Sequence, residues 1–201
     1  MTTRTDLSAS PPIESRADLL SVFERGEKAP ADWRIGTEHE KFVYRLADHR
    51  APSWDEEGGI RDLLIGLTEF GWKPVEEGGK VIALTGEDGT ISLEPAGQLE
   101  LSGAPLENLH ESCAESGRHL KQVKAVGDRL GLGFLGLGMW PDKARTDLPM
   151  MPKGRYAIMA RHMPRVGSLG LDMMLRTCTI QTNLDYASEA DMVKKFRVGL
   201  A

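Results

Sequence analysis

The sequence is poor in cysteine, in aromatic residues and in long apolar runs. Only two cysteines, Cys113 and Cys178, occur among 201 residues, and they lack metal-ligand spacing with the five histidines. We therefore expect reduced thiols and neither a disulfide scaffold nor a zinc site. No apolar run approaches the roughly 18 residues of a membrane-spanning helix, so we expect no membrane association.

An excess of positive charge is also lacking. The 25 Lys and Arg residues are scattered and the net charge is -5, so a nucleic-acid partner is not expected. Residues 1–12 are polar and contain no signal-peptide core, which predicts a cytoplasmic protein. Nothing in the sequence indicates an oligomeric state.

The apolar periodicity predicts an α+β protein with a mainly antiparallel sheet and flanking helices. We expect residues 1–13 to form a flexible tail and residues 14–201 to belong to one domain. Strands are expected at 34–46, 81–85, 90–94, 98–102, 132–139 and 173–185, and helices at 15–26, 60–70, 106–130 and 155–162 and from 188 onward. The helix at 106–130 should bury one apolar stripe that includes Cys113. The last helical pattern is cut at Ala201, which suggests a truncated chain unless the helix simply ends there.

Two of the expected strands carry acids on one face. Side chains alternate across a strand, so Glu38 and Glu40 point the same way, and His39 between them points to the opposite face, where a structural role is expected. If no bulge intervenes, one face of the later strand carries Ser92, Glu94, Gln98, Glu100 and Ser102. The segment Pro95–Gly97 should bend or bulge that strand, because proline cannot donate to a sheet ladder.

Clustered carboxylates indicate a cation site. Four glutamates on neighbouring strands would repel one another unless cations neutralise them, and ligation by oxygen alone favours Mg²⁺ or Mn²⁺. Mg²⁺ commonly bridges carboxylates and phosphates, which points to ATP-dependent chemistry. The alternative is that these glutamates lie on the solvated face of an antiparallel sheet.

The segment Met150–Tyr156 places cations next to a proline-rich loop. Arg155 could clamp a carboxylate in a two-pronged geometry, although an arginine on a loop is often merely solvated. The glycine pairs at 131–133 and 136–138 lack the lysine of a phosphate-binding loop, so packing is the favoured interpretation.

Four segments together resemble the plant-type glutamate–cysteine ligases, a family that is also widespread in proteobacteria. They are RIGTEHEKF at 34–42, ISLEPAGQLELSG at 91–103, MPKGRY at 151–156 and GSLGLDMMLRTCTIQTN at 167–183. The resemblance implies a curved antiparallel sheet related to glutamine synthetase and other carboxylate-amine ligases. It also implies ATP-dependent joining of the glutamate γ-carboxyl to cysteine through a γ-glutamyl phosphate, the first step of glutathione biosynthesis. Members of the family are about twice as long, so we expect an N-terminal portion that is incomplete for catalysis alone.

By motif position, the resemblance also implies roles for individual residues. The metal ligands would be Glu38, Glu40, Glu94 and Glu100; the ATP-binding residues Glu38, Glu94, Gln98, Gln181 and Asn183; the catalytic residues Glu100, Glu40 and Arg155; and the substrate-binding residues Arg155 and Tyr156. The cofactors would be ATP and Mg²⁺, and the substrates glutamate, cysteine and ATP. A related ligase with another amine acceptor and a non-catalytic remnant are the alternatives.

Overall fold

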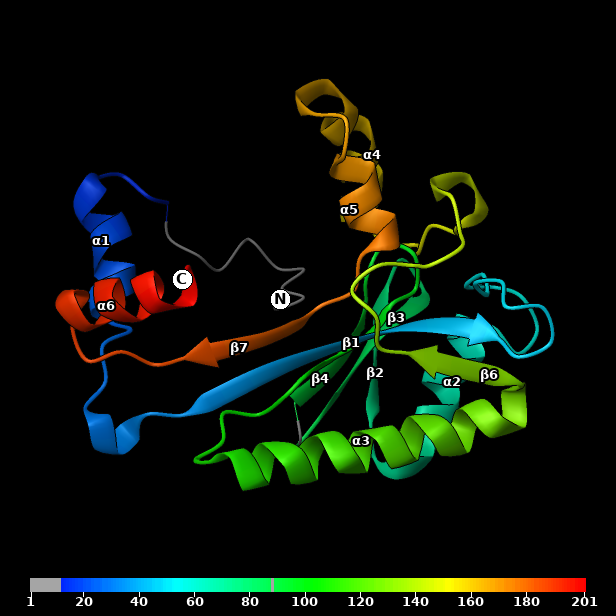
Figure 1. Ribbon diagram of the computed structural model, residues 1–201, viewed down its shortest axis with the longest axis horizontal. Coiled ribbons are helices and arrows are strands. Elements are labelled where there is room, and N and C mark those ends of the chain that lie inside the picture. The colour runs from blue at the N-terminus through cyan, green and yellow to red at the C-terminus, as the bar shows by residue number, and fades with distance from the viewer. Residues whose placement is uncertain (1–11, 88) are drawn as a thin grey trace.

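The computed structural model describes residues 12–87 and 89–201. They form an α+β structure with one seven-stranded sheet and helices on both of its faces (Figure 1). The strands are β1 (Ile35–Arg45), β2 (Lys73–Glu77), β3 (Lys80–Gly86), β4 (Gly89–Leu93), β5 (Leu99–Ser102), β6 (Leu132–Leu135) and β7 (Ile180–Leu184). The α-helices are α1 (Arg16–Glu24), α2 (Ile60–Leu67), α3 (Leu109–Leu130), α4 (Gly154–Val166), α5 (Gly170–Arg176) and α6 (Glu189–Gly199). Short 3-10 helices are η1 (Pro30–Asp32), η2 (Thr68–Phe70) and η3 (Arg145–Asp147). The expected tail lies largely in residues 1–11, outside the described residues.

Strand β1 organises the sheet. The strand order is β2-β3-β4-β5-β1-β6, and β7 also pairs with β1. On one edge β1 pairs with β5; on the other, β7 pairs with its first half, over Ile35 to His39, and β6 pairs with its second half, over Phe42 to Arg45. All of these strand pairings are antiparallel, as predicted.

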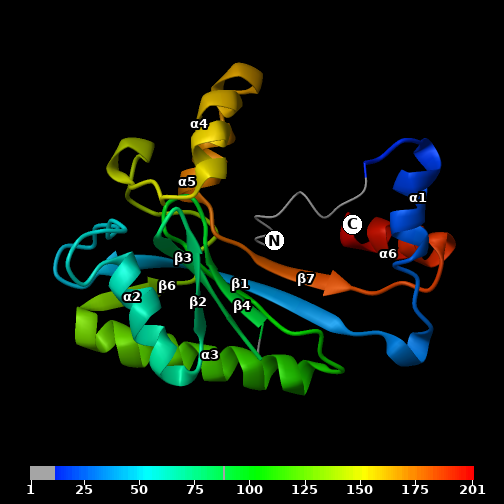
Figure 2. The same ribbon diagram turned by 180° about the vertical axis from the view of Figure 1, so that it is seen from behind.

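Helices α2 and α3 cover one face of the sheet, and α4 and α5 rise from the other (Figure 2). The amphipathic pattern of α2 explains its position, since its buried residues recur at helical spacing. The main core between α2, α3 and the sheet includes Ile60, Leu63, Leu64, Leu67, Leu84, Ile91, Leu93, Leu99, Leu101, Val123 and Val126. Helices α1 and α6 lie together at the far end of β7, where the Lys28 ammonium meets the Asp185 carboxylate at 2.7 Å.

The buried face of α3 differs from the predicted apolar stripe. Cys113, Leu109 and Leu120 are exposed, and the side chains that α3 buries are Ser112, Glu115, His119, Val123 and Val126. Hydrogen bonding explains part of this exchange, because Glu115 accepts the backbone N–H of Ala104 at 2.8 Å as the chain leaves β5. Burial, together with the charges of Lys41 and His39, lowers the pKa of His119 to about 3, so its imidazole is neutral at physiological pH.

The predicted strand at 173–185 is wrong in its first part. Residues up to Arg176 form α5, and only Ile180–Leu184 form a strand. Helix α5 buries Met174 and Leu175 in a small cluster with Ala96, a tertiary contact that strand periodicity does not reveal. Strand β2 was not predicted, because its sequence KPVEE combines a proline with charged residues. Within the described residues, no helix is long and apolar enough to cross a membrane.

The buried aliphatic face of β5 should dominate stability. Leu99 is 0% exposed, so Leu99→Ala removes contacts on all sides and should lower the free energy of unfolding by about 2–5 kcal/mol. Leu137→Ala is the matched control, because Leu137 is 46% exposed and its loss should change little. Denaturant unfolding of both variants measures the difference; equal effects would contradict this packing.

Candidate functional site

A cavity of about 530 Å³ lies on the face of the sheet opposite α2 and α3. The sheet supplies its polar wall, and α4, α5 and the segment leading into β7 supply the facing wall. Its lining includes Glu38, Glu40, Glu94, Gln98, Glu100, Met159, Met174, Thr179 and Gln181. All four predicted glutamates therefore border one hollow.

Strand register explains this convergence. Glu40 of β1 lies directly opposite Glu100 of β5, which in turn lies opposite Ser92 of β4. Residues directly opposite on paired strands share a face, with Cβ atoms roughly 5 Å apart. Glu94 reaches the same region from the predicted break, a turn closed by a 2.9 Å hydrogen bond from the Glu94 N–H to the Gln98 carbonyl oxygen.

Glu100 is the most buried of the four acids. It is 2% exposed, and its carboxylate accepts hydrogen bonds from Ser102 Oγ at 2.7 Å and Ser92 Oγ at 3.1 Å. Burial raises the pKa of Glu100, but the bonds from the two serines contribute to a net pKa below the usual value. Glu100 is therefore ionised at neutral pH.

Glu94 behaves in the opposite way. Burial first, and then the negative charge of Glu100, raise the pKa of Glu94 to about 7, against the opposing influence of Lys153 and Arg155. Burial also raises the pKa of Glu40, although its carboxylate accepts the Thr179 N–H at 2.7 Å. A proton on Glu94 thus partly neutralises the negative charge of the acidic cluster. A bound cation would also neutralise this charge.

The donor set fits a hard cation. The available donors are carboxylate oxygens, which Mg²⁺ and Mn²⁺ prefer. Within residues 12–87 and 89–201, however, no three His, Cys, Asp or Glu residues converge into a ready-made cage. Mg²⁺ needs no such cage, because it retains waters and takes phosphate oxygens beside one or two carboxylates.

Arg155 and Tyr156 adjoin this cavity at Glu94. A nitrogen of the Arg155 guanidinium lies 3.5 Å from Glu94 Oε1 and donates to the Tyr156 hydroxyl at 3.1 Å. Tyr156 is 1% exposed and its hydroxyl donates to the Leu93 carbonyl oxygen, so it lies behind Arg155 and supports it. The guanidinium faces the acids, whereas the phenol belongs to the core.

Lys153 was not among the predicted site residues. It is 3% exposed, its ammonium donates to the Leu93 carbonyl oxygen at 2.7 Å, and burial is the main cause that lowers its pKa to about 8. The available signal was its place in the sequence MPKGRY, two residues before Arg155.

The three predicted amide residues lie in different environments. Gln98 is buried, and its amide links the Ala96 N–H (2.8 Å) to the Thr177 carbonyl oxygen (2.8 Å), so it fastens the turn to the end of α5. Asn183 donates to Glu38 Oε1 at 3.1 Å from the exposed strand β7. Gln181, opposite Glu38 in the register, lines the cavity.

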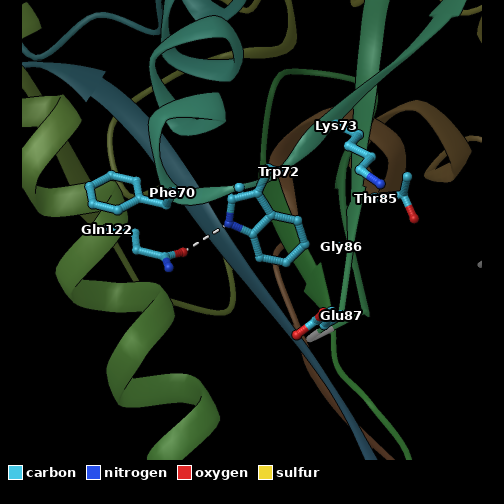
Figure 3. A pocket seen from close by; sticks show the side chains of 8 residues that line it. Phe70, Trp72, Lys73, Thr85, Gly86, Glu87 and Gln122 are labelled. Atoms are coloured by element: carbon cyan, nitrogen blue, oxygen red, sulfur yellow. Dashed lines mark hydrogen bonds between the residues drawn. The ribbon is translucent and has the colours of Figure 1, made fainter.

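A second cavity, of about 500 Å³, lies elsewhere, between η2, the β3–β4 turn and α3 (Figure 3). Its central Trp72 donates its indole N–H to Gln122 Oε1 at 2.9 Å. Lys73 and Glu87 are its charged lining residues, so it offers no acidic cluster. Of these two cavities, the glutamate-lined one holds the acidic cluster.

The pKa of Glu94 provides a test of this electrostatic arrangement. Glu100→Gln removes the neighbouring negative charge, so the pKa of Glu94 should fall by about one unit. Side-chain carbon NMR across a pH titration measures it, with Glu69→Gln, a remote exposed charge change, as the control. An unchanged pKa in Glu100→Gln would show that Glu94 and Glu100 do not interact.

Comparison with known proteins agrees with the motifs. The family model for glutamate-cysteine ligase family 2 matches residues 34–201. The chloroplastic glutamate–cysteine ligases of Medicago truncatula and Arabidopsis thaliana are each 53% identical to this chain over 205 residues, covering 97% of it but only 40% and 39% of their own lengths. Ligase B of Oryza sativa subsp. japonica is also 53% identical, with 41% of its length covered. The chain thus spans about two fifths of the length of these relatives, and it belongs to glutamate-cysteine ligase family 2.

Proposed function

We propose that the protein containing this chain joins the γ-carboxyl of glutamate to the amine of cysteine at the expense of ATP. The observation that carries the proposal is the convergence of Glu40, Glu94 and Glu100, with Arg155 beside them, around one cavity. The relatives are named glutamate–cysteine ligases, which favours cysteine over another amine acceptor.

The proposed reaction has two steps. A γ-carboxylate oxygen of glutamate attacks the terminal phosphorus of ATP, which releases ADP and gives γ-glutamyl phosphate. The amine of cysteine then attacks the activated carbonyl carbon, and phosphate and a proton leave as the peptide-like bond forms. Both steps develop negative charge on phosphate oxygens, which positioned positive charge stabilises.

We assign the residues of this chain to metal binding, substrate binding and nucleotide binding. Glu38, Glu40, Glu94 and Glu100 would hold Mg²⁺, which when bound would screen the phosphate charges. Arg155 would bind the substrate carboxylate in a fork geometry, with Tyr156 fixing its orientation. Gln181 and Asn183 would bind the nucleotide from β7, while Gln98 would hold the turn that carries Glu94.

The fold is consistent with this function. An antiparallel sheet with one acidic, open face supports a relation to the glutamine synthetase-like ligases, and we propose that residues 14–201 form part of a single catalytic domain. The relatives are named chloroplastic, and the cytoplasmic location expected from the sequence stays a prediction for this chain.

Binding of Mg²⁺ and ATP can be measured on the 201-residue chain. Together they should raise its melting temperature, and Glu100→Gln should abolish most of that increase because it removes a buried anionic ligand. Glu69→Gln, which removes an exposed charge elsewhere, should keep the increase. Equal stabilisation of both variants would mean that the ligands bind outside this cavity.

We expect ATP turnover only in a protein as long as the full-length relatives. A protein that carries this sequence at full family length should hydrolyse ATP rapidly only when glutamate, cysteine and Mg²⁺ are all present. There, Glu100→Gln should reduce kcat by about two orders of magnitude or more, since it weakens the site for the Mg²⁺ that would screen the phosphate charges. Full activity of Glu100→Gln would contradict the site. No ATP turnover in the unaltered protein would favour the non-catalytic remnant.

A further inference from the structure

A smaller cavity, of about 210 Å³, lies between α3 and β1 at the edge of the sheet. His39 and Lys41 alternate with Glu38 and Glu40 along β1, so their side chains leave the strand on the opposite face from these acids. Glu40 and Ile180 border both this cavity and the glutamate-lined cavity. It sits where β6 and β7 part: β7 pairs with β1 up to His39, and β6 begins to pair at Phe42. The proposed ligase reaction uses none of His39, Lys41 and His119.

His119 gives this cavity its chemical character. The side chain is 3% exposed and lines the cavity, yet neither of its ring nitrogens has a hydrogen-bond partner among the described residues. A buried polar group without a partner is costly, so buried polar atoms in folded proteins are nearly always satisfied. The imidazole of His119 is therefore placed to bind a polar group that enters the cavity.

Two further nitrogen-containing side chains, Lys41 and His39, line the same cavity. Lys41 is 6% exposed, and its ammonium donates to the His39 carbonyl oxygen at 2.8 Å; within the described residues it has N–H donors to spare. The His39 ring nitrogen Nε2 lies 3.1 Å from Ser116 Oγ. One ammonium, two imidazoles and a hydroxyl thus border one cavity. These hydrogen-bond donors suit an anion with oxygen acceptors.

The size and walls narrow the class of anion. Leu120, Phe134 and Ile180 add apolar surface to the lining, and Glu40 and Gly136 complete it. The Glu40 carboxylate already accepts the Thr179 N–H at 2.7 Å. The Lys41 ammonium balances a single negative charge, whereas a phosphate dianion would bring excess charge against apolar walls and beside the Glu40 carboxylate. We propose that this cavity binds a small monocarboxylate, with its carboxylate between Lys41 and His119 and a short apolar tail against Phe134.

The test uses propionate as the probe and the His119 ring nitrogens as the reporter. In nitrogen-15 NMR of the 201-residue chain at constant ionic strength, propionate should shift both His119 ring signals and saturate. Propionamide, which has the same shape without the charge, should cause no shift, and phosphate should bind at least about tenfold more weakly, as expected for loss of a charge-matched hydrogen-bonded fit.

Variants locate the binding. His119→Phe and Lys41→Met should each weaken propionate binding by about tenfold or more, measured by calorimetry, because each removes a hydrogen-bonding group. His110→Phe is the matched control, since His110 is an exposed histidine on the same helix, and it should bind as the unaltered chain does.

Four results would overturn the proposal. Absence of a saturable shift would mean that only water fills the cavity, and equal binding of phosphate or propionamide would mean that it is not a carboxylate site. Unchanged affinity in Lys41→Met, or a loss of affinity in His110→Phe equal to that in His119→Phe, would place the ligand elsewhere. The NMR titration of the unaltered chain decides the question even if a variant fails to fold.

Discussion

The pairing of β1 with three other strands is the constraint on which the rest of the structure depends. Because side chains alternate across a strand, this single segment sends Glu38 and Glu40 to one face of the sheet and His39 and Lys41 to the other. Pairing with β5 then sets Glu40 opposite Glu100. Pairing with β7 brings Gln181 and Asn183 to the same acidic wall, since they lie opposite Glu38 and Gly36. A slip of one residue in this register would turn the acids toward the hydrophobic core, so the core residues Leu99 and Leu101 also fix the geometry of the site.

The same constraint produces an electrostatic conflict. Like charges directly opposite each other on paired strands are unfavourable, yet Glu40 and Glu100 are held in that relation, with Glu94 nearby. The serine hydroxyls keep Glu100 ionised, while its charge and burial raise the pKa of Glu94 to about 7. The protein thus maintains an acidic cluster that a proton neutralises only in part. A divalent cation would relieve this repulsion, which supports the proposed phosphate chemistry at this sheet.

Much of this arrangement could be predicted from the sequence, because strand alternation is a local rule. It placed Glu38 and Glu40 on one face and His39 on the other, and the proline and glycine at 95 and 97 predicted the break that carries Glu94. Features that depend on tertiary contacts could not be predicted. The Tyr156 hydroxyl is buried because it donates to the Leu93 carbonyl oxygen and accepts from Arg155. The Gln98 amide donates to the Thr177 carbonyl oxygen just after α5. The residues before Arg176 are helical, and Met174 and Leu175 among them pack with Ala96. Apolar periodicity also could not predict that α3 buries the polar residues Glu115 and His119, because their burial depends on tertiary contacts.

In the proposed function, the wall formed by Glu40, Glu94 and Glu100 holds the metal–nucleotide complex. The most direct measurement is paramagnetic broadening of NMR signals by Mn²⁺ bound with a non-hydrolysable ATP analogue. We expect strong, selective broadening of the side-chain signals of these three glutamates, while the indole signal of Trp72 in the other large cavity remains sharp. Broadening centred on Trp72, or spread evenly over the surface glutamates, would show that the metal–nucleotide complex does not bind at this wall.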